Sequence, residues 1–61
     1  MTKKEFDQIM NHTYKFTSLV NARYFARRSR YWIVMGDDDR YWVTTPRKAE
    51  KLERAGYEII K

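Results

Sequence analysis

Two short runs of aromatic and β-branched residues, separated by a turn sequence, constrain the fold of this chain more than any other feature. The runs are Tyr31–Met35 and Arg40–Thr44, and residues of these types favour extended strands. The residues between them, Gly36–Asp39, are of the types that form tight turns. The segment is therefore predicted to be a β-hairpin whose four-residue turn places Met35 opposite Arg40.

The residues after the hairpin predict a helix followed by a third strand. Thr45 is suited to cap the N-terminus of a helix, and Pro46 is suited to its first position. Helical residues continue to Ala55, and Gly56 stands where a left-handed residue would end the helix. Tyr57–Ile60 then has the composition of a short strand. A right-handed crossover would place it beside the first hairpin strand, so that this strand lies between its hairpin partner and the last strand.

The N-terminal half predicts one helix or two. Thr2 and Glu5 have the spacing of a capping box, and apolar residues follow at helical spacing, so we expect a helix over residues 3–12. A second helical stretch is expected over residues 17–27, and the pattern leaves open whether the two are continuous. The predicted fold class is α+β: an N-terminal helix or helices, a β-hairpin, a C-terminal helix and a short third strand in a small antiparallel sheet, with the helices on one face.

The chain is long enough for a single domain, residues 1–61, and contains no cysteine, which excludes disulfides and thiolate metal sites. A domain of this size buries only about 60% of the surface that its unfolded chain exposes. We therefore expect its stability to come from a tight aromatic core or from self-association as a homo-oligomer. No apolar run is long enough to cross a membrane, and no signal-peptide core follows the N-terminus. A cytoplasmic protein without a membrane partner is expected.

The net charge of +5 is concentrated in one internal segment. No acidic residue lies between Asp7 and Asp37, and the basic residues outside this interval balance the acidic ones. The basic residues inside it are Lys15, Arg23, Arg27, Arg28 and Arg30. Such asymmetry indicates a polyanion or an acidic protein surface as the partner.

Aromatic residues alternate with arginines in the second half of this segment, a pattern typical of nucleic-acid binding. Guanidinium groups pair with phosphates, and aromatic rings stack on unpaired bases. The residues that we expect to bind nucleic acid are Arg23, Arg27, Arg28, Arg30 and Tyr31. The alternative is a solvated helix end, where the helix dipole favours basic residues without any ligand, and where the rings belong to the core.

The hairpin also predicts a second kind of interface, because both of its faces are apolar. Alternation along the first strand places Tyr31 and Ile33 on one face and Trp32 and Val34 on the other. If the helices cover one face only, the other is an apolar patch of the kind that binds proteins. The residues of this protein interface would be Trp32, Val34 and Trp42. Alternatively, the N-terminal segment covers this face.

No group of residues has the spacing of a catalytic or metal site. Asp37–Asp39 are consecutive carboxylates without the alternating ligands and distal glutamate of a calcium-binding loop, so we expect a solvated turn without metal. His12 is the only histidine, and the nearest acid, Asp7, lies at an offset that places it on a different side of a helix. We therefore expect a non-enzymatic binding protein without a cofactor.

The segment Trp42–Pro46, followed by a charged helix and by Ala55–Ile60, resembles the tail of small accessory proteins of tailed bacteriophages and prophages. The resemblance covers residues 31–61. It implies an accessory or regulatory protein that acts in the cytoplasm of a bacterial host, and it carries no catalytic residues. The function that we expect is nucleic-acid binding through the basic and aromatic segment. The alternative is a modulator that docks an apolar sheet face on a host protein.

Overall fold

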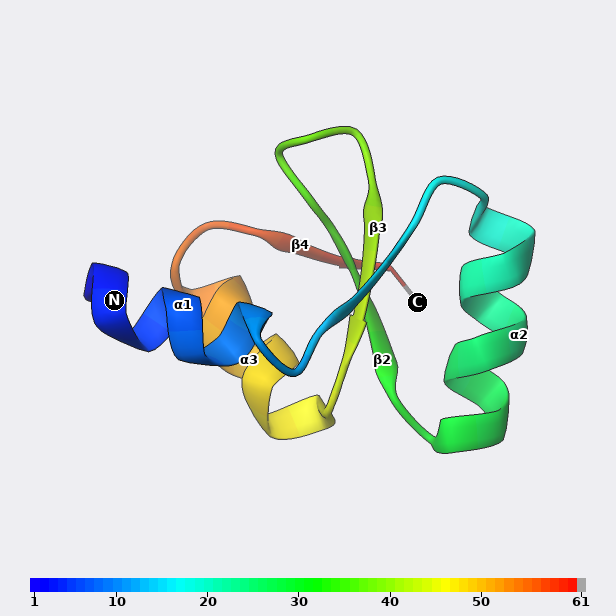
Figure 1. The fold of residues 1–61 in the computed structure, drawn as a ribbon, viewed down its shortest axis with the longest axis horizontal. Helices are drawn as coiled ribbons and strands as arrows, with labels where there is room; N and C mark the ends of the chain where they lie inside the picture. Colours follow the sequence, from blue (N-terminus) through cyan, green and yellow to red (C-terminus); the bar gives the residue numbers. More distant parts are fainter. Residues whose placement is uncertain (61) are drawn as a thin grey trace.

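The fold is a four-stranded antiparallel sheet with helices on both faces, as Figure 1 shows. The computed structural model describes residues 1–60. The elements are α1 (Lys3–Met10), β1 (Tyr14–Phe16), α2 (Leu19–Ser29), β2 (Trp32–Met35), β3 (Tyr41–Thr44), α3 (Pro46–Arg54) and β4 (Glu58–Ile60). The predicted α+β class is confirmed. The prediction that the helices lie on one face is wrong, because α2 covers one face and α1 and α3 cover the other.

The strands lie in the order β1-β3-β2-β4, and every neighbouring pair is antiparallel. The predicted position of the last strand beside the first hairpin strand is confirmed. The prediction omitted β1, which pairs with β3 at the opposite edge of the sheet. This strand separates α1 from α2, so the N-terminal half forms two helices rather than one.

Each helix begins at a hydroxyl side chain that accepts a backbone hydrogen bond. Thr2 accepts from the Glu5 N–H at 3.1 Å, and Thr45 accepts from the Lys48 N–H at 3.4 Å, so both predicted caps are confirmed. Ser18 caps α2 in the same way through the Asn21 N–H, at 3.4 Å. The Ser18 cap explains why α2 begins at Leu19, two residues later than predicted.

Gly56 ends α3 in the predicted left-handed conformation, with a φ of 108°. Its N–H donates to the Glu53 carbonyl at 3.0 Å, and the Tyr57 N–H donates to the Leu52 carbonyl at 3.1 Å. These two bonds form a Schellman motif, which satisfies carbonyls at the helix end and reverses the chain into β4. Tyr57 then packs against the core cluster that contains Leu52.

The hairpin turn is one residue shorter than predicted. Met35 lies opposite Tyr41 rather than Arg40, and the Gly36 N–H donates to the Arg40 carbonyl at 2.8 Å. The turn therefore consists of Asp37–Asp39, and Asp39 has a left-handed φ of 62°. A three-residue turn that ends in a left-handed residue is a common hairpin connection. The corrected register places Val34 opposite Trp42, on the same face of the sheet.

Packing against Trp42 explains why a glycine precedes this turn. A Cβ added at Gly36 would lie 2.5 Å from Trp42 Nε1 and 2.7 Å from a carboxylate oxygen of Asp38. The indole thus occupies the space that a side chain at this position would need. Trp42 is 2% exposed, and it contacts the rings of Phe6 and Tyr57 at centroid distances of 6.0 and 5.1 Å.

Two neighbouring threonines at the junction of β3 and α3 should respond oppositely to substitution. The Thr44 hydroxyl is buried without a hydrogen-bond partner among the described residues, whereas the Thr45 hydroxyl caps α3. Because a buried unsatisfied hydroxyl is unfavourable, Thr44→Val should raise the free energy of unfolding by about 1 kcal/mol. Thr45→Val should lower it by about 1 kcal/mol, because the cap is lost. Urea-induced unfolding measures both, and an equal loss in the two variants would contradict this assignment.

Candidate nucleic-acid interface

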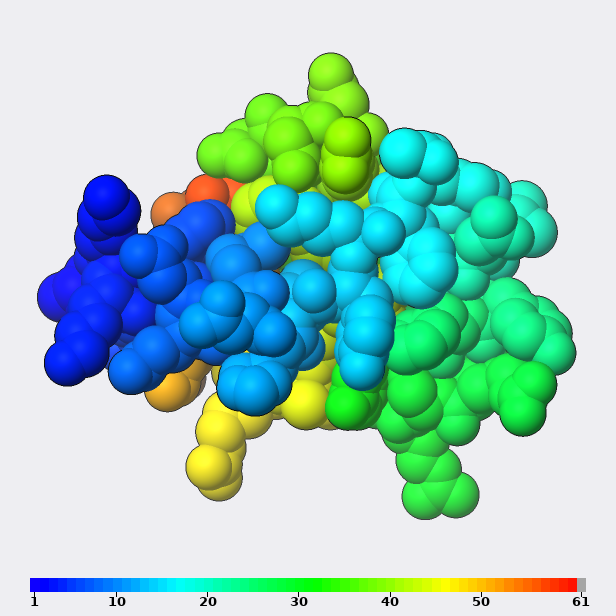
Figure 2. All heavy atoms as spheres, viewed as in Figure 1, coloured from blue at the N-terminus to red at the C-terminus, as the bar shows by residue number. Residues whose placement is uncertain are grey.

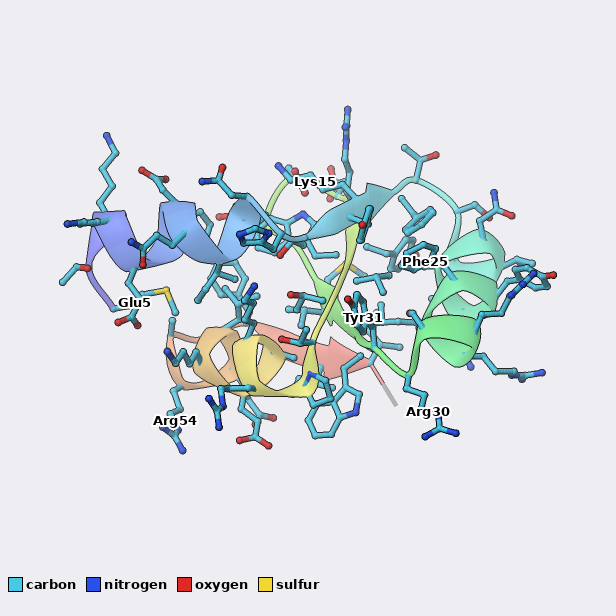
Figure 3. All side chains as sticks on the ribbon, turned by 60° about the horizontal axis from the view of Figure 1, so that its bottom comes forward. Glu5, Lys15, Phe25, Arg30, Tyr31 and Arg54 are labelled. Carbon is cyan, nitrogen blue, oxygen red and sulfur yellow. The ribbon has the colours of Figure 1, made fainter. Side chains whose placement is uncertain are left out.

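The outward side of α2 carries most of the residues that were predicted to bind nucleic acid. Arg23, Arg27 and Arg28 are exposed along this helix, and Arg30 is exposed at its C-terminal cap. Figure 3 shows Arg30 pointing away from the protein at the turn between α2 and β2. The one ion pair formed within residues 1–60 joins Lys15 to Asp38, so none of these four arginines is neutralised by a described acidic residue.

The inward side of α2 explains why its arginines face solvent. Ala22 and Ala26 are buried against the sheet, together with the partly buried rings of Phe16 and Phe25. Alanine side chains let the helix lie close to the strands, where no long charged side chain would fit. Helical periodicity then places Arg23 and Arg27, four residues apart, on the side away from the sheet.

An exposed tyrosine accompanies these arginines. Tyr24 is 63% exposed, and its hydroxyl accepts a hydrogen bond from Arg28 Nη1 at 3.1 Å. The Arg28 guanidinium also lies over the Tyr24 ring, 5.7 Å from its centroid. The two side chains therefore hold each other in one orientation through a hydrogen bond and a cation–π contact.

Beside Tyr24 lies a surface hollow of about 340 Å³. It is lined by Tyr24, Phe25, Arg28 and Ser29. Phe25 forms its apolar wall and also contacts Tyr14 of β1, with 4.7 Å between ring centroids. Tyr14 is 53% exposed, so aromatic surface extends from the sheet edge to α2. In Figure 2 the light-blue atoms of β1 lie directly beside the green atoms of α2.

Tyr31, which was predicted to stack on bases, belongs instead to the core beneath α2. It is half-buried, and its ring meets the edge of Phe25 at a centroid distance of 6.2 Å. Figure 3 shows Tyr31 between α2 and the sheet. Beside α2, the most exposed rings are those of Tyr14 and Tyr24, which were not among the predicted binding residues. The i,i+4 spacing of Tyr24 and Arg28 was the signal that could have identified Tyr24.

Lys15 is separated from the arginines of the same basic segment. It pairs with Trp42 across the strands, so its side chain shares the face of the sheet opposite to α2. Its ammonium lies 3.6 Å from the Asp38 carboxylate and 5.6 Å from the centroid of the Trp42 ring. Of the basic residues of the segment, the four arginines therefore lie on α2 or at its C-terminal cap, and Lys15 does not.

The predicted apolar face for docking a host protein does not exist as an open surface. Val34 is fully buried, and Trp42 is almost fully buried, because α1 and α3 cover this side of the sheet. Trp32, which is 40% exposed, is the one residue of this group that reaches solvent. The alternative expectation, that the N-terminal segment covers the face, is confirmed by the packing of Phe6 and Ile9 of α1.

A larger hollow, of about 400 Å³, lies between α2 and β4. Its lining consists of Ala26, Tyr31, Trp32, Ile33, Ile59 and Ile60. No acidic, basic or histidine side chain lines this hollow, and the polar side-chain groups among its lining residues are the Tyr31 hydroxyl and the Trp32 indole N–H. His12, the one histidine, is exposed in the turn after α1.

The aspartates of the hairpin turn have partners within the protein. One oxygen of Asp38 accepts hydrogen bonds from Trp42 Nε1 at 3.1 Å and from the Arg40 N–H at 3.2 Å. Asp37 accepts a hydrogen bond from the Tyr57 hydroxyl at 3.3 Å. Desolvation by burial raises the pKa of Tyr57 above its usual 10.0, and the negative charge of Asp37 raises it further. Within residues 1–60, no three acidic, histidine or cysteine side chains converge as metal ligands would.

Comparison with known proteins finds no matching family model, curated protein or solved structure. Across residues 1–60, every helix is too short or too polar to cross a membrane.

The contacts of Asp38 lead to a prediction about stability. Asp38→Ala should lower the free energy of unfolding by about 1–3 kcal/mol, because the buried Trp42 indole N–H loses its acceptor. Asp39→Asn is the matched control, since asparagine tolerates the left-handed backbone at this position. The control should change stability little. Urea unfolding followed by circular dichroism compares the two, and equal stabilities would show that the Asp38 contacts contribute nothing.

Proposed function

We propose that this protein is a non-enzymatic accessory protein that binds nucleic acid through the outward side of α2. The observation that carries the proposal is the set of exposed arginines on a helix that contains no acidic residue. Because no described acidic side chain neutralises them, their positive potential extends into solvent and attracts a polyanion. Phosphates satisfy guanidinium groups well, since charge and hydrogen bonding act together.

The aromatic neighbours of the arginines favour nucleic acid over an acidic protein surface. Tyr24 and Tyr14 are exposed, and their rings can stack on bases, whereas a carboxylate would contact only their hydroxyl groups. The helix dipole favours Arg27 and Arg28 in the last turn, but it does not account for Arg23 near the middle of α2. The helix dipole also does not explain why an exposed tyrosine, Tyr24, is hydrogen-bonded to Arg28.

The setting that we propose for this activity is the cytoplasm of a bacterial host, as the resemblance to phage accessory proteins implies. Docking of an apolar sheet face on a host protein is the less favoured function, because α1, α2 and α3 cover both faces. The arginines could also contact an acidic protein. A binding test with nucleic acid distinguishes this partner from the proposed one.

The salt dependence of binding tests the proposal directly. Each phosphate contact releases counterions, so about three or four contacts should give a slope of log K against log salt of about −2 to −4. Arg27→Gln combined with Arg28→Gln should weaken binding and make the slope less negative by about 2. Fluorescence anisotropy with labelled single-stranded and duplex oligonucleotides, from about 50 to about 200 mM salt, measures both quantities.

A double variant on α3 provides the matched control. Arg47→Gln combined with Lys51→Gln removes the same amount of positive charge from exposed positions on the opposite side of the sheet. This variant should bind with nearly the affinity and salt slope of the parent protein. If the parent binds neither kind of oligonucleotide, or if the two double variants behave alike, α2 is not a nucleic-acid interface.

A further inference from the structure

We infer that the nucleic acid bound by α2 is single-stranded, and that Tyr24 stacks on one of its bases. This inference rests on the proposed function, because it specifies the ligand of the same surface. Positive charge alone suits duplex and single strand equally, so the distinction depends on the aromatic side chains and on the hollow beside them.

The first observation is the exposure of the rings. Tyr24 is 63% exposed and Tyr14 is 53% exposed, while Phe25 is partly buried against the core beneath α2 and contacts the Tyr14 ring. In a duplex, the faces of the bases are stacked on one another, so an exposed ring finds no base face to cover. In a single strand, the base faces are accessible, and each stacked base contributes substantially to affinity.

The second observation is the arrangement of Arg28 on Tyr24. The guanidinium lies over the ring and donates to its hydroxyl at 3.1 Å. The cation thus lies toward the hydroxyl end of the ring, and the exposed part of Tyr24 is left for a base. The remaining N–H groups of Arg28 can donate to the phosphate of the same nucleotide. The pair therefore provides a stacking surface and a phosphate donor next to each other.

The third observation is the hollow beside the ring. Its wall of Phe25 is apolar, and Arg28 contributes its polar rim. The Ser29 hydroxyl, which also lines it, already donates to the Phe25 carbonyl at 2.7 Å. The hollow therefore offers apolar surface to a flat base rather than a set of free hydrogen-bonding groups. Stacking without base-edge hydrogen bonds predicts weak dependence on nucleotide sequence.

The arginines lie on both sides of this ring. Helical spacing places Arg23 and Arg27 on one side of Tyr24 and Arg28 on the other, with Arg30 beyond the helix end. A strand that crosses α2 can contact these groups through successive phosphates while a base rests on Tyr24. A duplex laid on the helix would use the same arginines and would leave the ring without a role.

The test compares a single strand of about 12 nucleotides with the duplex of the same sequence, at the same salt concentration. The parent protein should bind the single strand at least about tenfold more tightly than the duplex, since stacking is gained only there. Tyr24→Leu should lower the affinity for the single strand by about tenfold and lower the affinity for the duplex much less, because only the single strand loses a stacked base. Tyr24→Phe, which keeps the ring, should retain most of the single-strand affinity.

The outcomes separate this inference from the proposed function. If duplex and single strand bind equally and Tyr24→Leu changes neither affinity, the single-strand inference is wrong. The proposed function survives that result, provided that replacing Arg27 and Arg28 still weakens binding to both. Inorganic polyphosphate is the second probe, and its binding as tightly as the single strand would also overturn the inference, because charge alone would then be recognised. Thermal unfolding of each variant confirms that α2 remains folded.

Discussion

The burial of the Trp42 indole is the contact on which the arrangement of the other elements depends. Its ring lies over Gly36, its N–H donates to Asp38, and the rings of Phe6 and Tyr57 pack against it. This one side chain therefore connects the hairpin turn, α1 and the segment after α3. It also determines the register of β3, and a shift of one residue would exchange every side chain between the two faces of the sheet. With Trp42 on the side of α1 and α3, Val43 and Tyr41 necessarily point toward α2.

The position of α2 follows from this register and leads to the proposed interface. Its alanines and Phe25 pack on the face that Val43 and Ile33 provide, which leaves its arginines and Tyr24 in solvent. The acidic residues lie elsewhere, on α1, on the hairpin turn, on α3 and on β4. The folded protein thus has one helix that is purely basic, although the same chain carries 8 acidic residues. The separation of charge along the sequence becomes a separation between surfaces.

Features determined by local chemistry could be predicted from the sequence, and features determined by distant contacts could not. The two hairpin strands, the threonine caps and the left-handed Gly56 depend on residues close to one another in the sequence. Each of these features was predicted correctly. Strand β1 has three residues, too few for an alternating pattern, and it forms because β3 offers a free edge. The turn length depended on the fit of Trp42 against Gly36, which only the folded chain reveals.

The same difference between local and distant contacts explains which residues of the candidate site could be predicted. The arginines were identified because their charge has no acidic counterpart nearby in the sequence, a local property. The sequence did not reveal that Tyr24 is exposed while Tyr31 is partly buried, because burial depends on which residues pack between α2 and the sheet. Whether α2 binds nucleic acid can be measured by mapping backbone amide chemical shifts during titration with a single-stranded oligonucleotide. Saturable changes are expected in residues 20–30 and at Tyr14, with α1 and α3 unaffected. Changes centred on α3 or on the edge of β4, or no changes at all, would contradict it.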